Sequence, residues 1–150
     1  MLKFSLAAAM LLATSSLQAA ESAAKVVDVK IPLNSYMEGL QNEGVQELPS
    51  LVVFKATGEC LKVIDTAKIT EIAPQLNRAI GDGVIHCTVT PSKHFDKTGD
   101  ISTPMATVHL QLVLLDASVC TLCPGYIDEV QKVLDARKDV RLVVIRVVTK

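Results

Sequence analysis

Apolar and polar side chains between residues 25 and 40 follow two different periods, one after the other. Residues 25–31 (KVVDVKI) are rich in β-branched side chains and end at Pro32, so they predict a short strand. Residues 33–40 carry apolar side chains at helical spacing, with polar residues near the start that are suited to cap a helix. We therefore expect a strand that leads directly into a short helix.

Two apolar runs separated by a tight turn follow. Residues 51–56 (LVVFKA) form a near-continuous apolar run, which is typical of a strand buried on both faces. Residues 57–59 (TGE) have a turn composition, and residues 60–64 (CLKVI) return as a second strand. This pattern predicts a β-hairpin.

The next segment has helical periodicity. Its apolar side chains recur at i, i+3, i+7 and i+11, at Ile69, Ile72, Leu76 and Ile80. Asp65 or Thr66 is suited to cap the start of this helix, and residues 81–83 (GDG) end it. Pro74 lies inside the pattern and predicts a kink or a late start, because proline lacks the N–H that a helix interior needs.

The second half of the chain repeats the alternation of strand and helix. Residues 84–89 (VIHCTV) predict a short strand, and the polar residues at about 90–104 predict a connecting loop. Residues 106–116 (ATVHLQLVLLD) predict a long central strand, and residues 140–148 (VRLVVIRVV) predict a closing one. Between them, four apolar positions at helical spacing predict an amphipathic helix: Cys123, Ile127, Val130 and Leu134. Strands that alternate with helices predict an α/β fold with a largely buried sheet.

The first 19 residues have the organisation of a secretory signal peptide. Lys3 gives a positive start, residues 4–13 form an apolar stretch too short to span a bilayer, and small residues precede a cleavage point after Ala19 or Ala20. A core helix at the N-terminus is the alternative. The signal-peptide interpretation leaves residues 20–150 as a single domain and predicts a periplasmic or secreted protein.

Composition narrows the class of partner. The chain has 150 residues, is 49% hydrophobic and has a net charge of −1, so it forms a core without help from disulfides. The charge, and the absence of basic runs interleaved with aromatic residues, argue against a nucleic-acid groove. Beyond the signal peptide no apolar run approaches about 18 residues, so we expect no membrane span in the mature chain.

The four cysteines need another explanation, because the core does not require them. After export into an oxidising compartment, Cys60, Cys87, Cys120 and Cys123 are expected to pair. Cys120 and Cys123 form a CxxC motif between the predicted central strand and the helix that follows. Unpaired N–H groups and the macrodipole at a helix N-terminus stabilise a thiolate and lower the pKa of the first cysteine. We expect Cys120 to be the exposed nucleophile and Cys123 the partly buried resolving thiol.

A zinc site, a structural disulfide and two unpaired thiols compete with redox chemistry at this pair. Zinc needs four ligands, but a second CxxC motif is absent and His86, His94 and His109 are scattered. A disulfide across so short a loop constrains the unfolded chain little. Unpaired core cysteines are disfavoured after export. The sequence favours redox chemistry, with no cofactor and no metal expected.

Two parts of the chain resemble known protein architecture. Residues 112–134 (LVLLDASVCTLCPGYIDEVQKVL), followed by the strand at residues 140–148, resemble the active-site β-α-β unit of the thioredoxin superfamily. Residues 26–80 resemble the remainder of that fold: a strand, a short helix, a proline-preceded strand, a hairpin and a closing amphipathic helix. The resemblance implies a thioredoxin-like central mixed sheet flanked by helices.

The two units occur in the reverse of the family's order. The CxxC unit comes first in the family, whereas here the unit with Pro49 precedes the unit with Cys120. We therefore expect a circularly permuted or rearranged domain, which is physically reasonable because the ends of a domain are often close together. Residues 25–31 and 140–148 both resemble one family strand, so either the sheet has an extra edge strand or a strand is exchanged between subunits of a dimer.

The resemblance also implies a second part of the site. Leu48-Pro49-Ser50 lies where these proteins carry a cis-proline that faces the active-site disulfide, and a trans proline at the start of an edge strand is the alternative.

The roles of three other residues stay open at the sequence level. Cys60 and Cys87 form either a structural disulfide or two buried thiols. Asp116 either accepts a proton from Cys123 or caps the turn before the pair.

Two functions follow from this pattern. The first is an exported thioredoxin-like thiol-disulfide oxidoreductase. In it, Cys120 exchanges with protein thiols or disulfides or with a redox partner protein, Cys123 resolves the mixed disulfide, and Pro49 shapes the substrate groove. The second is a non-catalytic thioredoxin-like module that binds a protein in the bacterial envelope and whose disulfides are structural.

Overall fold

The computed structural model of the protein describes residues 26–40, 48–91 and 107–149. The expected signal peptide at residues 1–19 and most of the polar loop at about 90–104 lie outside these described residues.

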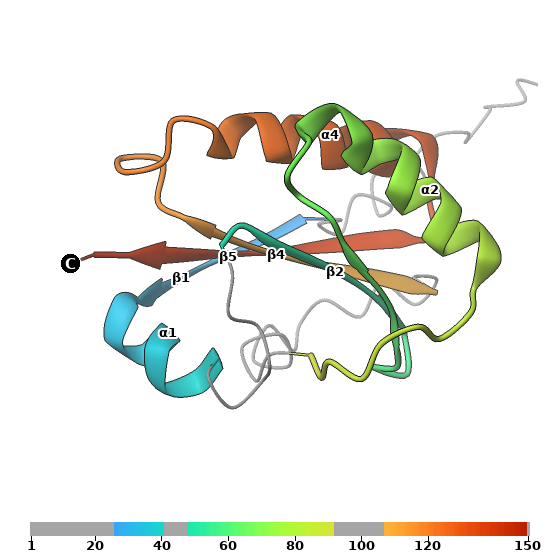
Figure 1. Ribbon diagram of the computed structural model, residues 1–150, viewed down its shortest axis with the longest axis horizontal. Helices are drawn as coiled ribbons and strands as arrows, with labels where there is room; N and C mark the ends of the chain where they lie inside the picture. Colours follow the sequence, from blue (N-terminus) through green and yellow to red (C-terminus); the bar gives the residue numbers. More distant parts are fainter. Residues whose placement is uncertain (1–25, 41–47, 92–106, 150) are drawn as a thin grey trace, which may run out of the picture.

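A five-stranded mixed sheet forms the centre of the molecule (Figure 1). Its strands are β1 (Val26–Pro32), β2 (Ser50–Lys55), β3 (Cys60–Ile64), β4 (Val108–Leu115) and β5 (Val140–Val148), in the spatial order β1-β5-β4-β2-β3. The pairs β1–β5 and β5–β4 are parallel, whereas β2 runs antiparallel to both β4 and β3. The prediction of an α/β fold is confirmed at this level.

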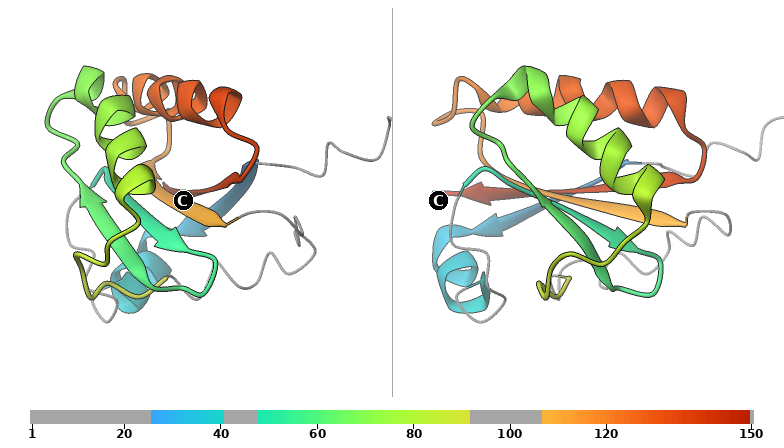
Figure 2. Two further views of the ribbon diagram at one scale, coloured as in Figure 1. Left: turned by 90° about the vertical axis from the view of Figure 1, so that its right-hand side faces the viewer. Right: turned by 45° about the vertical axis from the view of Figure 1, so that its right-hand side comes forward.

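Helices cover both faces of the sheet. Helices α2 (Ile72–Asp82) and α4 (Cys123–Ala136) lie over one face, and the short helix α1 (Leu33–Leu40) lies on the other (Figures 1 and 2). None of the helices in the described residues combines the length and the apolar composition needed to cross a membrane.

The start of α2 departs from the expected capping. A 3-10 turn, η1 (Ile69–Glu71), precedes α2, and Pro74 falls in the first turn of α2, so the expected late start is confirmed. Neither Asp65 nor Thr66 caps this helical segment, which begins beyond Lys68. Asp65 instead accepts a hydrogen bond from the Ala67 N–H (2.9 Å) and closes the turn ahead of it. The prediction of a cap at Asp65 was wrong because its carboxylate binds the Ala67 N–H, in a turn that ends before the helical segment begins.

The strand predicted at residues 84–89 is not formed. α2 ends at Gly83, which adopts the left-handed conformation (φ 61°), and residues 83–91 then cross the side of β3 without regular structure. Among the described residues, the His86 N–H to the Leu61 carbonyl (3.0 Å) is the one backbone hydrogen bond from residues 84–91 to β3. A single bond does not make a ladder, so this segment does not extend the sheet beyond β3.

The strand β1 lies at one edge of the sheet. β1 pairs with β5 of the same chain along its whole length, from Val26 opposite Leu142 to Pro32 opposite Val148. Across this pair, Arg146 Nε donates a hydrogen bond to Asp28 Oδ2 (2.7 Å). An ion pair this exposed contributes about 0–1 kcal/mol, so backbone pairing supplies most of the attachment.

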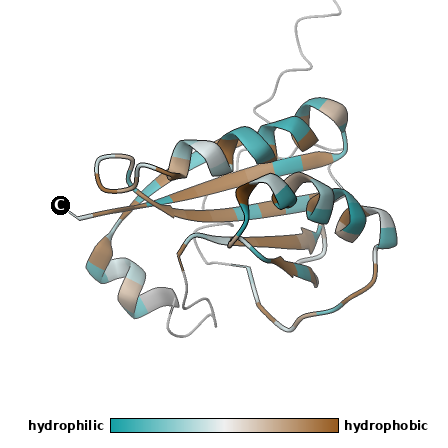
Figure 3. Cartoon of the chain, turned by 45° about the horizontal axis from the view of Figure 1, so that its top comes forward, coloured by the Kyte–Doolittle hydropathy of each residue, from teal (hydrophilic) through white to brown (hydrophobic). Residues whose placement is uncertain are grey.

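The main hydrophobic core fills the space between the sheet and helices α2 and α4. Its strand residues include Leu51, Val53, Leu110, Leu112, Leu142 and Val144, and its helix residues include Ile72, Leu76, Val130 and Leu134. A second cluster packs beneath the other face against Tyr36 of α1. Because β4 and β5 are buried on both faces, their sequences are hydrophobic along most of their length (Figure 3). This burial explains why these two strands were predictable from continuous apolar runs.

Polar side chains enter the second face at the start of the two central strands. His109 of β4 lies directly opposite Arg141 of β5, and both side chains share the face of Val113 and Val143. Burial, and then the positive charge of Arg141, lower the pKa of His109 below its usual range. His109 is therefore neutral in the folded protein near neutral pH.

Stability should fall on acidification because of His109. The pKa of His109 is lower in the folded state than in the unfolded state, so the unfolded chain binds the extra proton first as the pH drops through about 6.5. The free energy of unfolding, measured by urea denaturation at pH 7.5 and pH 5, should decrease more for the wild type than for His109→Gln. His86→Gln, which changes an exposed histidine, is the matched control and should keep the wild-type decrease. An equal decrease in His109→Gln and wild type would contradict this account.

Candidate functional site

The CxxC motif lies in the connection between the central strand β4 and helix α4. β4 ends at Leu115, a turn follows, and α4 begins at Cys123. The Asp116 carbonyl accepts hydrogen bonds from the N–H groups of Val119 (2.9 Å) and Cys120 (3.1 Å). The turn therefore fixes the backbone of Cys120 directly to the end of a buried strand.

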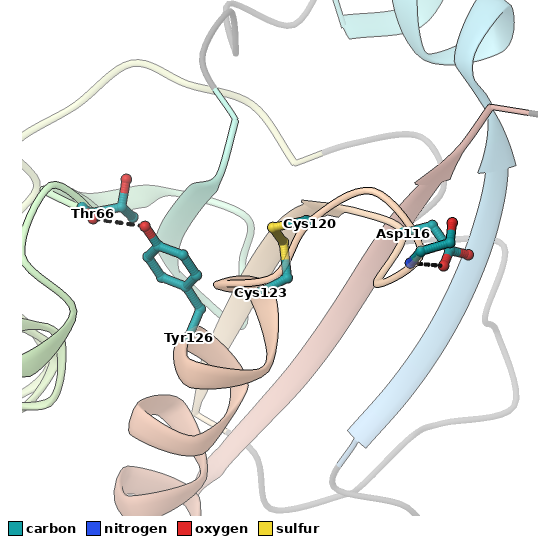
Figure 4. Close-up of a disulfide and its surroundings, with 6 residues drawn as sticks. Thr66, Asp116, Cys120, Cys123 and Tyr126 are labelled. Atoms are coloured by element: carbon teal, nitrogen blue, oxygen red, sulfur yellow. Dashed lines mark hydrogen bonds between the residues drawn. A yellow bond between two sulfur atoms is a disulfide. The ribbon is translucent and has the colours of Figure 1, made fainter.

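Asp116 stabilises this turn with its side chain as well. Its Oδ1 atom accepts a hydrogen bond from the Ser118 N–H (3.0 Å), and this bond lowers the pKa of the carboxyl below its usual value. The positive charges of Lys30 and Arg146 act in the same direction. The carboxylate points away from the cysteine pair (Figure 4). Of the two roles expected for Asp116, the structure supports the turn cap and not proton transfer with Cys123.

Cys120 and Cys123 form a disulfide between two residues that differ in their exposure to solvent. The Sγ atoms are 2.04 Å apart. Cys123 is 1% exposed and belongs to the main core, whereas Cys120 is partly exposed and packs against the edge of that core. Of the two cysteines, Cys120 is therefore the one that an attacking thiolate can approach from solvent.

The positive end of α4 at this disulfide is not neutralised by a side chain. The residue that caps α4 is Leu122, which makes no side-chain hydrogen bond to the helix, and the first turn contains no acidic residue. Pro124 in that turn removes one N–H that would have no partner in the helix. The remaining partial positive charge is therefore available to a negative charge that develops on a cysteine sulfur.

Two apolar side chains next to Cys120 in the chain are exposed. Val119 and Leu122 flank the cysteine and are 52% and 62% exposed. No charged residue lies between Asp116 and Asp128 in the sequence.

Pro49 lies at the same edge of the sheet as the CxxC motif. It directly precedes β2, whose first residue, Ser50, pairs with Val113 near the end of β4. Because β2 and β4 are antiparallel, the first residue of β2 and the last residues of β4 lie at the same end of the sheet. The Leu48–Pro49 peptide bond is cis. The strand pairing thus brings together the two segments that the sequence placed far apart.

Two hydrogen bonds connect the Pro49 segment to the helix that carries Cys123. The Thr66 hydroxyl donates to the Pro49 carbonyl (3.0 Å), and the Tyr126 hydroxyl donates to the Thr66 carbonyl (3.2 Å; Figure 4). Tyr126 is buried and lies one helical turn after Cys123. Sequence analysis considered Thr66 only as a helix cap and did not single out Tyr126. The available signal was the tyrosine hydroxyl on the apolar face of α4, since a buried hydroxyl usually has a partner.

Cys60 and Cys87 are joined in a second disulfide, with an S–S distance of 2.00 Å. Cys60 is the first residue of β3, it is buried, and it pairs with Phe54 near the end of β2. Together with Cys87, these residues belong to a small cluster separate from the core that holds Cys123. The bond ties residues 83–91 to the edge of the sheet.

The two disulfides lie at opposite ends of β2. Six strand residues between Pro49 and the turn after Lys55 span roughly 17–20 Å at about 3.3 Å per residue. Thiol-disulfide exchange requires direct contact between sulfur atoms, so electrons do not pass between the two pairs in this conformation.

Neither of the two histidines in the described residues lies at the cysteine pair. His109 lies on the second face beside Arg141, His86 is exposed in the segment after α2, and His94 lies outside the described residues. In the described part of the chain, no group of three or more histidine, cysteine, aspartate or glutamate side chains is arranged to hold a metal ion.

No protein-family model, curated protein or solved structure matches this chain.

The Tyr126 hydrogen bond should contribute measurably to stability. Tyr126→Phe removes the bond to Thr66 while the ring stays in the core, so the free energy of unfolding should fall by about 1 kcal/mol. The matched control is Tyr36→Phe. Tyr36 is equally buried (6% against 7%), but its hydroxyl has no hydrogen-bond partner among the described residues, and burial raises its pKa. Tyr36→Phe should leave stability unchanged or increase it. Equal losses in the two variants, measured by urea denaturation, would refute the assignment.

Proposed function

We propose that this protein is an exported thiol-disulfide oxidoreductase of thioredoxin-like fold, with the two units of that fold in reversed order along the chain. The observation that carries the proposal is the placement of the CxxC disulfide. Its partly exposed Cys120 and buried Cys123 lie at an uncapped helix start, at the sheet edge where Pro49 begins β2.

The sheet topology supports the proposed fold. β4, α4 and β5 form a parallel β-α-β unit with the cysteine pair at its first junction. The hairpin β2–β3, followed by α2, forms the second unit, and the pairing of β2 with β4 joins the two units in one sheet. This is the arrangement expected if Pro49 and the cysteine pair are two parts of one site, whichever unit comes first in the chain.

The proposed reaction is a reversible two-step exchange. A substrate thiolate attacks the Cys120 sulfur, the Cys120–Cys123 bond breaks, and Cys123 leaves as a thiolate that takes up a proton. A second substrate thiolate then attacks the substrate sulfur of the mixed disulfide and releases Cys120 as a thiolate. The substrate loses two electrons and forms a disulfide, and the cysteine pair gains two electrons; the reverse sequence reduces a substrate disulfide.

The environment of the pair supports this division of roles. Cys120 is the more accessible of the two cysteines. The partial positive charge at the start of α4 is not neutralised by an acidic side chain, so it stabilises the Cys120 thiolate when this sulfur is the leaving group. Cys123 is shielded from substrate thiols, and in the reducing direction its thiolate attacks the Cys120 sulfur of the mixed disulfide, so that the Cys120–Cys123 bond forms again and the substrate leaves as a thiolate. The exposed apolar side chains of Val119 and Leu122 give a polypeptide substrate a surface to contact beside Cys120.

A Cys123→Ser variant tests the exchange chemistry. The reduced wild-type pair, offered a single-cysteine peptide as its symmetric disulfide, should release two peptide thiols and return to the Cys120–Cys123 disulfide. Cys123→Ser should release one peptide thiol and retain one peptide on Cys120, because no second thiol resolves the intermediate. Mass spectrometry and thiol release report both numbers, and the first step should be at least about tenfold faster than exchange by the free peptide thiol.

The control for this experiment is Cys120→Ser, which leaves only the buried Cys123 and should react slowly. A first step no faster than that of the free peptide thiol would favour the non-catalytic binding module, in which both disulfides are structural.

A further inference from the structure

We propose that Thr66 is a positioning residue of the Cys120–Cys123 site, which holds the Pro49 segment at a fixed place relative to α4. The inference rests on the proposed function, because it assigns a role in the binding of a peptide substrate. Thr66 bonds in both directions: its hydroxyl donates to the Pro49 carbonyl, and its own carbonyl accepts the Tyr126 hydroxyl (Figure 4).

Pro49 lies just outside the hydrogen-bonded ladder of β2, and its neighbour Leu48 packs against the second cluster. The ladder between β2 and β4 begins at Ser50, and proline has no N–H to donate. Within the described residues, the Thr66 hydroxyl is the hydrogen-bond donor to the Pro49 carbonyl, at 3.0 Å. Loss of this hydroxyl therefore removes the hydrogen bond that holds the Pro49 carbonyl, at the end of the sheet where β4 leads into the CxxC turn.

Thr66 is itself held in a rigid position. The neighbouring residue Asp65 makes two backbone hydrogen bonds with the Gln75 side chain of α2: its N–H donates to Oε1 (3.1 Å), and its carbonyl accepts from Nε2 (3.0 Å). The Asp65 carboxylate closes the turn with the Ala67 N–H. A donor fixed in this way loses little further entropy when it orients Pro49, so its hydroxyl is suited to positioning.

The same geometry separates substrate positioning from the chemistry of the sulfur atoms. The backbone of Cys120 is fixed by the Asp116 turn, and the charge stabilisation comes from the start of α4. Neither depends on the Thr66 hydroxyl. Removal of this hydroxyl should therefore weaken the binding of a polypeptide, which contacts both Cys120 and the Pro49 segment, without changing the reactivity of the disulfide.

The test compares Thr66→Val, which removes the hydroxyl at nearly constant shape, with Thr66→Ser, which keeps it. For reduction of a peptide disulfide, with glutathione as the thiol that reduces the pair after each turnover, Thr66→Val should raise KM by about three- to tenfold at unchanged kcat, which corresponds to the loss of one hydrogen bond. Thr66→Ser should stay within about twofold of the wild type. The rate with 2-hydroxyethyl disulfide, a small uncharged probe, and the reduction potential of the pair should be the same in all three proteins.

Two further variants guard against a purely structural effect. Thr107→Val removes a hydroxyl that donates to the Asp139 carboxylate (3.1 Å) at the far end of β4, and it should not change KM. If Thr66→Val does not fold, Tyr126→Phe loosens Thr66 from the side of α4 and should raise KM in the same way.

Each outcome decides a different claim. A wild-type protein that does not exchange with the peptide overturns the proposed function and this role with it. A wild type that exchanges, with KM unchanged in Thr66→Val, overturns only the positioning role. An equal loss of rate with the peptide and with 2-hydroxyethyl disulfide also overturns it, because Thr66 would then act on the disulfide itself.

Discussion

The antiparallel pairing of β2 with β4 is the interaction on which the site depends. It joins the two halves of the chain in one sheet, with Ser50 opposite Val113 and Lys55 opposite Val108. Because the two strands run in opposite directions, the start of β2 and the end of β4 lie at the same end of the sheet. Pro49 and the CxxC turn, which adjoin these strand ends, lie there as well. The buried side chains of Leu51, Val53, Leu110 and Leu112 lie together in the main core and stabilise this pairing.

The two disulfides lie at opposite ends of β2 and differ in their surroundings. At one end, the Asp116 turn and the start of α4 leave Cys120 accessible beside exposed apolar residues. At the other end, the disulfide between Cys60 and Cys87 ties the irregular segment after α2 to the edge strand β3. The first disulfide combines access with a favourable charge environment, whereas the second one joins a buried cysteine to a segment that lacks a strand ladder. These differences are the physical basis for assigning exchange chemistry to the first pair and not to the second.

Local patterns predicted the elements well where burial and periodicity agree. β3 and β5 have the predicted bounds because each is a compact apolar run, and α1 begins directly after Pro32 as its spacing indicated. The strand predicted at residues 84–89 was wrong, because this segment makes one backbone hydrogen bond to β3 and not a ladder. Asp65 failed as a cap because its carboxylate closes an earlier turn. The link through Thr66 was not predictable, since its partners Pro49 and Tyr126 lie 17 and 60 residues away and meet only after the sheet forms.

The reduction potential of the Cys120–Cys123 pair tests the central claim most directly. Equilibration of the folded protein with defined ratios of reduced and oxidised dithiothreitol or glutathione, read by mass spectrometry after thiol trapping, gives the value for each pair separately. A dithiol that exchanges with protein substrates should have a potential between about −270 and −120 mV, with the Cys60–Cys87 disulfide still oxidised where the first pair is half reduced. A potential well below about −300 mV would mark Cys120–Cys123 as a structural disulfide and contradict the account.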